Sequence, residues 1–173
     1  MIKRRNDKIS SKDSSPMKGR REGAPDEEQI LRKLAADCAR SEHCTGEMAD
    51  KMRRWGIDEE VQARIIAYLV EHHYIDDQRY AKLFVREKMK FNQWGPRKIE
   101  QALWAKHVDE TIYRPVLNEV TAEEWLEILR PLLAAKKKSI KAQTPYEEKM
   151  KLMKYAVSRG FTMDIIEKIK NEE

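Results

Sequence analysis

The amino-acid sequence predicts an all-α protein of three tandem three-helix repeats, arranged as an elongated, curved, solenoid-like body behind a disordered basic N-terminal tail. Three observations lead to this fold class. Only six of the 173 residues are glycine and 38% are charged, a balance that suits solvated helices better than sandwiches or barrels. No run of five or more residues alternates between apolar and polar side chains as a strand does. One helix–turn–helix pattern occurs three times along the chain.

Residues 1–25 are expected to form the disordered tail. They contain eight Lys or Arg and three acidic residues, so their net charge of +5 equals that of the whole chain. Their scattered apolar residues cannot bury enough surface to offset the conformational entropy of folding. The tail lacks the apolar segment of a secretory signal, and the longest apolar run, residues 65–70, is too short to cross a bilayer. We therefore expect a cytoplasmic protein with no membrane partner.

The repeat is centred on three predicted helix-ending turns at Gly56, His107 and Gly160, which lie 51 and 53 residues apart. Glycine at such a turn adopts the left-handed backbone conformation at little cost. His107 departs from this preference, so we expect its backbone to differ there. Each turn is followed by an apolar residue and then by a residue of the type that caps a helix N-terminus. These pairs are Ile57 and Asp58, Val108 and Asp109, and Phe161 and Thr162.

A further helix precedes each copy of the pattern, because apolar residues recur there at i, i+4 spacing on one helix face. They are Ile30, Leu34 and Cys38 in the first copy, Tyr80 and Phe84 in the second, and Trp125, Leu129 and Leu133 in the third. This gives nine main helices in three repeats, with predicted boundaries at residues 26–75, 76–120 and 121–173. Pro115 and Pro131 fall within these helices and are expected to kink or interrupt them.

The segment HHYIDDQRYAKLFV, residues 72–85, contains the adjacent carboxylates Asp76 and Asp77. Such a pair could hold a metal ion, exchange protons or begin a helix. Adjacent residues of a helix do not share a face, so the two carboxylates would not converge on one ion without a special turn. We expect Asp76 to cap the helix that follows, which stabilises it by about 1 kcal/mol. His72 and His73 are expected at the end of the preceding helix.

No pattern that carries catalysis or binds a metal or a cofactor is present. The sequence lacks the P-loop, the dinucleotide-binding glycine pattern, GxSxG and HExxH. Its two cysteines, Cys38 and Cys44, are too few for a disulfide framework and fit free thiols in a reducing cytosol. His43 beside Cys44 has no second His/Cys cluster to complete a metal site. A metal-dependent nuclease built on Asp76 and Asp77 is rejected unless Mg²⁺-dependent DNA cleavage is observed.

Two stretches of the body concentrate basic residues. In VREKMKFNQWGPRK, residues 85–98, five of them surround Phe91 and Trp94, an arrangement that single-stranded nucleic acid or a protein groove could use. Packing of both aromatic rings within or between repeats is the alternative that we favour. The second stretch, residues 136–141, is either a solvated helix end or a contact for phosphates or an acidic partner. The candidate partner- or DNA-binding residues are Arg86, Lys90, Arg97, Lys98, Lys136, Lys137, Lys138 and Lys141.

The segment YIDDQRYAKLFV resembles the signature of the RecX family of recombinase regulators, in which Tyr or Phe, Ile, Asp and Asp are followed two residues later by Tyr or Phe and Ala. The matching positions, which we treat as a structural motif, are Tyr74, Ile75, Asp76, Asp77, Tyr80 and Ala81. The resemblance continues through NQWGPRKIEQALWAKHVDETI and covers residues 26–171. The family usually has a glycine where this chain has His107.

The resemblance implies a non-enzymatic regulatory protein. RecX proteins bind the RecA recombinase filament on single-stranded DNA, block its extension, and so restrain ATP hydrolysis, strand exchange and coprotease activity in recombinational repair and the SOS response. Some also bind DNA weakly, so single- or double-stranded DNA is a further expected contact. We expect a monomer without a cofactor. The alternative is a helical-repeat nucleic-acid-binding module that acts independently of RecA, whose binding should weaken steeply with salt and depend on residues 1–25.

Overall fold

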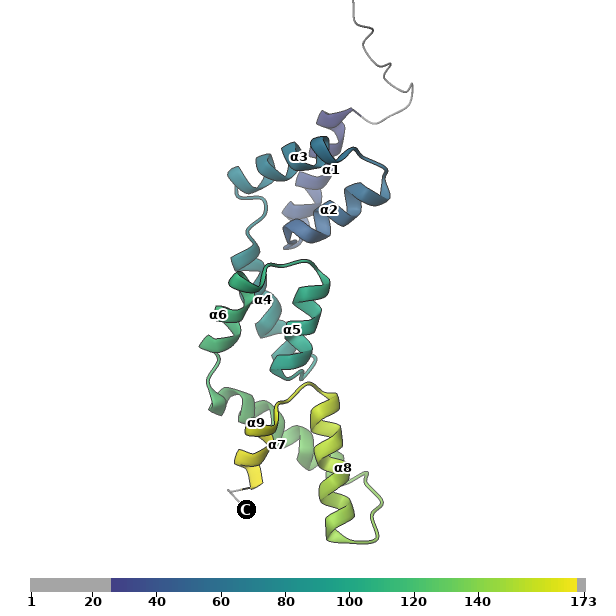
Figure 1. The fold of residues 1–173 in the computed structure, drawn as a ribbon, viewed down its shortest axis with the longest axis vertical. Coiled ribbons are helices and arrows are strands. Elements are labelled where there is room, and N and C mark those ends of the chain that lie inside the picture. The colour runs from purple at the N-terminus through teal and green to yellow at the C-terminus, as the bar shows by residue number, and fades with distance from the viewer. Residues whose placement is uncertain (1–25, 171–173) are drawn as a thin grey trace, which may run out of the picture.

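The computed structural model of the chain describes residues 26–170, so the tail predicted for residues 1–25 lies outside the described residues. Within them the chain forms nine α-helices and no strand, and the helices stack into a long row (Figure 1). The prediction of an all-α fold with three tandem three-helix repeats is confirmed. The helices are α1 (Glu27–Arg40), α2 (Thr45–Arg54), α3 (Glu59–Glu71), α4 (Asp77–Lys90), α5 (Pro96–Ala105), α6 (Glu110–Glu119), α7 (Ala122–Lys137), α8 (Pro145–Ser158) and α9 (Met163–Lys170).

Three successive units make up the row: α1–α3, α4–α6 and α7–α9 (Figure 1). In each unit the third helix packs against both the first and the second helix. The units follow one another along the long axis of the body (Figure 1). The residue boundaries predicted for the repeats stay predictions. Among residues 26–170, no helix is both long enough and apolar enough to span a membrane.

The same turn joins the second and third helices of every unit. Gly56 and Gly160 have left-handed backbones, with φ of 71° and 92°. His107 has φ of 59°, so the expectation that its backbone would differ from that of the glycines is wrong. In each copy the amide after this residue donates to the carbonyl five residues back, which is the bond of a Schellman motif. The three donor–acceptor pairs are Ile57 and Met52, Val108 and Leu103, and Phe161 and Ala156.

Two helices continue through a proline. Pro115 lies inside α6 and Pro131 inside α7, and neither ends its helix. Of the two predicted effects, interruption of the helix is therefore wrong, whereas a kink stays a prediction, since each proline removes one amide donor. α7 begins with a full capping box, in which Thr121 and Glu124 satisfy each other's backbone amides.

The apolar core is divided unequally along the row. The first unit has a core of its own, whose buried members include Leu34, Met52 and Leu69. The second and third units share one larger core that includes Leu103 and Leu129. From the first unit, only Cys44 contributes a buried side chain to the larger core. The first joint between units therefore needs contacts other than a shared apolar core.

Both joints place a glycine at the start of the second helix of one unit against the left-handed turn of the next unit. A Cβ on Gly46, at the start of α2, would lie 2.0 Å from the carbonyl oxygen of Lys106. A Cβ on Gly95, before α5, would lie 2.4 Å from the carbonyl carbon of Gly160. The amide of Gly95 also donates to the carbonyl of Arg159 at 2.8 Å. The backbones thus approach each other closer than any side chain would allow.

The turn glycines allow a matched test of this packing. Gly56→Ala should destabilise the protein by about 1 kcal/mol, because a left-handed alanine is strained but its Cβ meets open space. Gly160→Ala should cost about 2 kcal/mol more, because its Cβ would lie 2.6 Å from the backbone nitrogen of Lys98 in the neighbouring unit. Urea denaturation measures both changes in the free energy of unfolding. Equal losses in the free energy of unfolding would show that the joint tolerates a Cβ at position 160.

Candidate partner-binding surface

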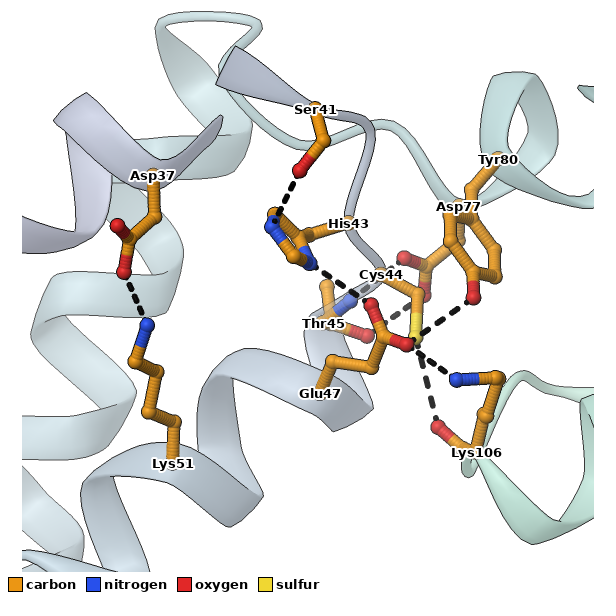
Figure 2. Close-up of polar contacts among 10 residues, drawn as sticks. All are labelled: Asp37, Ser41, His43, Cys44, Thr45, Glu47, Lys51, Asp77, Tyr80 and Lys106. Carbon is orange, nitrogen blue, oxygen red and sulfur yellow. Dashed lines mark hydrogen bonds and ion pairs between the residues drawn. The ribbon is translucent and has the colours of Figure 1, made fainter. Parts of the chain in front are cut away.

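The RecX-like motif runs from the link after α3 of the first unit into α4 of the second, and Figure 2 shows two of its residues, Asp77 and Tyr80. Ile75 is buried in the core of the first unit, whereas Tyr80 and Ala81 are buried in the core shared by the second and third units. Tyr74 remains 39% exposed beside them. Seven residues of chain thus anchor two separate cores, and this part of the motif serves the fold.

The two aspartates of the motif point to different helices. Asp76 caps α4, since its carboxylate accepts a hydrogen bond from the amide of Arg79 at 2.9 Å. The predicted capping role of Asp76 is confirmed. Asp77 reaches back to α2 and accepts from the amide and the hydroxyl of Thr45, at 2.8 and 2.6 Å (Figure 2). Because the carboxylates diverge, they do not form a shared ion site.

Glu47 lies at the centre of the polar contacts between the first and second units (Figure 2). Its carboxylate accepts a hydrogen bond from the hydroxyl of Tyr80 at 3.1 Å, contacts a ring nitrogen of His43 at 2.9 Å, and pairs with the ammonium of Lys106. Burial alone would raise the pKa of Glu47, but its bonds to Lys106, His43 and Tyr80 outweigh burial, so the pKa lies below its ordinary value of 4.5. A charged Glu47 therefore holds the first two units together.

The cysteine thiols near the joint are not activated as nucleophiles. Cys38 and Cys44 are free, as the sequence predicts. Cys44 is fully buried, and its thiol donates to the carbonyl oxygen of Lys106 at 3.5 Å. Burial raises the pKa of this thiol to about 11, so it stays protonated and is a poor nucleophile at neutral pH. Among residues 26–170, no group of three or more His, Cys, Asp or Glu side chains is placed to hold a metal ion.

The structure separates the eight predicted binding residues into several places. Arg86 and Lys90 lie on one face of α4, and both are exposed. Lys98 lies over the ring of Trp94, 4.9 Å from its centroid, and exposed Arg97 precedes it on α5. The remaining four cluster at the end of α7 and in the loop after it, and they are Lys136, Lys137, Lys138 and Lys141. The helices bring these residues onto different surfaces, not into one patch.

Arg86 and Lys90 line a cleft of about 520 Å³ between α4, α6 and α7. Lys82 extends their row along α4, so three bases form one wall, and no ion pair engages them among the described residues. Three exposed glutamates form the opposite wall, and apolar side chains form the floor. The glutamates are Glu119, Glu124 and Glu127, and the floor consists of Val85, Met89, Val116, Val120 and Ile128.

Sequence reasoning missed parts of this surface. The glutamates lie on two later helices, and only the packing of α6 and α7 brings them opposite α4. Phe91 is 73% exposed, so the preferred assignment of its ring to packing is wrong, whereas Trp94 is half-buried against the shared core. An apolar residue at the end of an amphipathic helix gives no sequence signal that separates these two outcomes.

Two family models match the chain. The model of the second three-helix domain of RecX matches residues 76–117, and the model of the third three-helix domain matches residues 122–169. Curated relatives named regulatory protein RecX include those of Caldanaerobacter subterraneus subsp. tengcongensis, Bacillus cereus strain AH820 and Acinetobacter baylyi. They are 32%, 30% and 32% identical, over alignments that cover 72%, 73% and 80% of this chain.

The same alignments cover 60%, 48% and 84% of these relatives, so the chain spans about half of the Bacillus relative. Solved structures agree with the fold. The crystal structure of RecX from Lactobacillus salivarius matches with a TM-score of 0.75 and 25% identity, covering 84% of this chain and 95% of that one. A crystal structure of regulatory protein RecX matches with a TM-score of 0.78 and 21% identity, covering 84% and 73%, which concerns the fold alone.

The motif aspartates should contribute separately to stability. Asp76→Ala should lower the free energy of unfolding by about 1 kcal/mol through loss of the α4 cap. Asp77→Ala should lower it by about 1–2 kcal/mol, because two bonds across the joint are lost. Gln78→Ala, an exposed neighbour, is the control and should change little. Urea denaturation gives all three values, and an Asp77→Ala variant as stable as wild type would exclude its role at the joint.

Stability should fall in acid through Glu47. Since its folded pKa lies below its ordinary 4.5, the stabilisation is present above that pH and is lost as pH falls through the folded pKa. The stability difference between wild type and Glu47→Gln should therefore be constant near neutral pH and shrink below about pH 4.5. Thermal unfolding from pH 3 to 7 measures it, with exposed Glu167→Gln on α9 as the control. A difference that does not vary with pH would contradict this assignment.

Proposed function

Because this chain belongs to the RecX family of regulatory proteins, we propose that it binds the RecA recombinase filament on single-stranded DNA and inhibits it without catalysing a reaction. The protein occupies surface between filament subunits and blocks extension, so ATP hydrolysis, strand exchange and coprotease activity fall. Binding that is tighter to one filament state than to others shifts assembly toward disassembly. The protein acts as a cytoplasmic monomer, without a cofactor, in recombinational repair and SOS control.

The observation that carries the proposal is the cleft between α4, α6 and α7. These helices belong to a long row of helical units (Figure 1). The basic wall of the cleft, Lys82, Arg86 and Lys90, faces a row of glutamates across an apolar floor. Opposed rows of exposed charge favour specificity and orientation in a protein complex more than affinity. An elongated body can place such a cleft along the groove of a helical filament.

A second candidate function is direct binding of single-stranded DNA. Exposed Phe91, with the ammonium of Lys90 5.4 Å from its ring centroid, offers a stacking surface beside positive charge. Arg97, Lys98 and the lysines from residue 136 to 141 would add phosphate contacts. The net charge of +5 in residues 1–25 would add sequence-independent attraction.

RecA inhibition should depend on the basic wall of the cleft. The double variant Arg86→Glu/Lys90→Glu should raise the concentration for half-inhibition of the single-stranded-DNA-dependent RecA ATPase by about tenfold. Arg54→Glu, an exposed base at the end of α2, is the matched control and should inhibit like wild type. A double variant that is folded and fully inhibitory would move the contact elsewhere on the body.

Removal of residues 1–25 separates the two functions. A chain of residues 26–173 should still inhibit the RecA ATPase at substoichiometric amounts, while its DNA affinity and the salt dependence of that affinity should fall. Fluorescence anisotropy with labelled oligonucleotides at two salt concentrations measures the DNA affinity and its salt dependence. If the shortened chain had no effect on RecA and lost only DNA binding, the RecA proposal would fail and the DNA-binding alternative would stand.

A further inference from the structure

A second groove, of about 560 Å³, lies in the third unit between α7, α8 and α9. It is formed by the C-terminal half of α7, the N-terminal half of α8 and one face of α9. Its wall is largely apolar, and the partly buried side chains in it include members of the shared core that reach the surface. The apolar lining consists of Leu133, Ala134, Leu152, Met153, Ile166 and Ile169.

The corresponding surfaces of the first two units are covered by the start of the following unit. In the first unit, α4 brings Asp77 to Thr45 and Tyr80 to Glu47 at the start of α2. In the second unit, Trp125 of α7 is buried in the core that the second and third units share, and it lines one cavity together with Arg97, at the start of α5. The groove of the third unit is the copy of this surface that the described residues leave uncovered. The repeat therefore indicates its occupant, which is the first turns of a helix.

The helices that cover the first two copies share a sequence character. The α4 segment begins with two aspartates and continues to Tyr80, and the α7 segment has Glu123 and Glu124 directly before Trp125. Tyr80 and Trp125 are both buried at their joints. An acidic first turn followed by an aromatic ring is thus the type of helix start that these surfaces accept.

The mouth of the third groove has the complementary charge. Residues 136–151 contain six lysines and two glutamates, a net charge of +4. Lys149 is exposed at the groove, with no ion pair among the described residues, and Lys137 lies 3.6 Å from its partner Glu148. These lysines would face the acidic first turn of an incoming helix, where opposite charge favours association.

A complete further unit does not fit the groove in the geometry of the two joints. Those joints need Gly46 or Gly95 at the start of the second helix, because a left-handed turn packs directly on the glycine. Counted back from Gly160 as Gly46 is from Gly56 and as Gly95 is from His107, the matching positions of α8 are Met150 and Glu148, so neither is a glycine. A left-handed turn packed as closely as in the two joints would clash with these side chains, whereas a single helix brings no turn.

We propose that this groove binds an amphipathic helix of a partner protein, with an acidic first turn followed by an aromatic side chain. The inference rests on the repeat and on the charge of the groove, so it does not depend on RecA as the partner. Of the lysines predicted from the sequence at positions 136–141, Lys137 then lies at the charged rim of an apolar site, together with Lys149.

The probe is a fluorescein-labelled peptide that contains residues 121–129, TAEEWLEIL, followed by an alanine-rich helical segment. Anisotropy with the full chain should show saturable binding. A peptide with glutamine at the three glutamate positions should bind about tenfold more weakly, as should wild-type peptide to the Lys137→Glu/Lys149→Glu variant. Lys154→Glu, an exposed base of α8 outside the groove, is the matched control. Leu152→Gln tests the apolar wall, with circular dichroism confirming that each variant is folded.

Three results would overturn the proposal. The first is a peptide that does not bind the full chain. The second is binding that the groove variants leave unchanged, which would show that the peptide displaces α7 from its own joint instead. The third is concentration-dependent self-association, measured by sedimentation and abolished by Lys137→Glu/Lys149→Glu, which would identify a second copy of the chain as the occupant. The assay contains no RecA, so its failure is distinct from failure of RecA inhibition.

Discussion

The close backbone contact between successive units is the constraint on which the rest of the structure depends. Each joint brings a left-handed turn against the start of a helix in the preceding unit, at a distance that excludes a Cβ at Gly46 or Gly95. The direction in which one unit follows another is fixed by this contact. Since the same turn recurs in all three units, the row of Figure 1 follows from one local rule applied twice.

The two joints combine this rule with different chemistry. The second and third units share an apolar core, which burial stabilises at any pH near neutrality. The first unit is joined mainly by Glu47, Asp77 and their partners, and the attraction between Glu47 and Lys106 depends on ionisation of Glu47 (Figure 2). The position of the first unit should therefore respond to acid and salt more than the pairing of the other two. The conformation of the RecX-like motif is coupled to that response, because Asp77 and Tyr80 belong to the motif and also make polar contacts between the first two units.

The sequence predicted what depends on neighbours along the chain and missed what depends on distant partners. The turn spacing and the Asp76 cap follow from local rules, and both are found. Asp77 caps a helix that begins 32 residues earlier, which no local pattern indicates. His107 adopts the left-handed conformation because its helix ends in the same Schellman bond as the glycine copies, so the turn as a whole outweighs the preference of one residue.

The basic wall of the cleft is not explained by helix stability. Elsewhere the chain places opposite charges four residues apart, as in the pairs Glu28 and Arg32, Glu110 and Arg114, and Glu147 and Lys151. On α4, Lys82, Arg86 and Lys90 place like charges at that spacing, which destabilises a helix by roughly 0.2–0.5 kcal/mol per pair. Attraction to the glutamates across the cleft offsets part of this repulsion. A partner that presents acidic side chains to α4 and basic side chains to α7 would offset the remaining repulsion. The electrostatic free energy of the cleft would therefore be lowest when such a partner is bound.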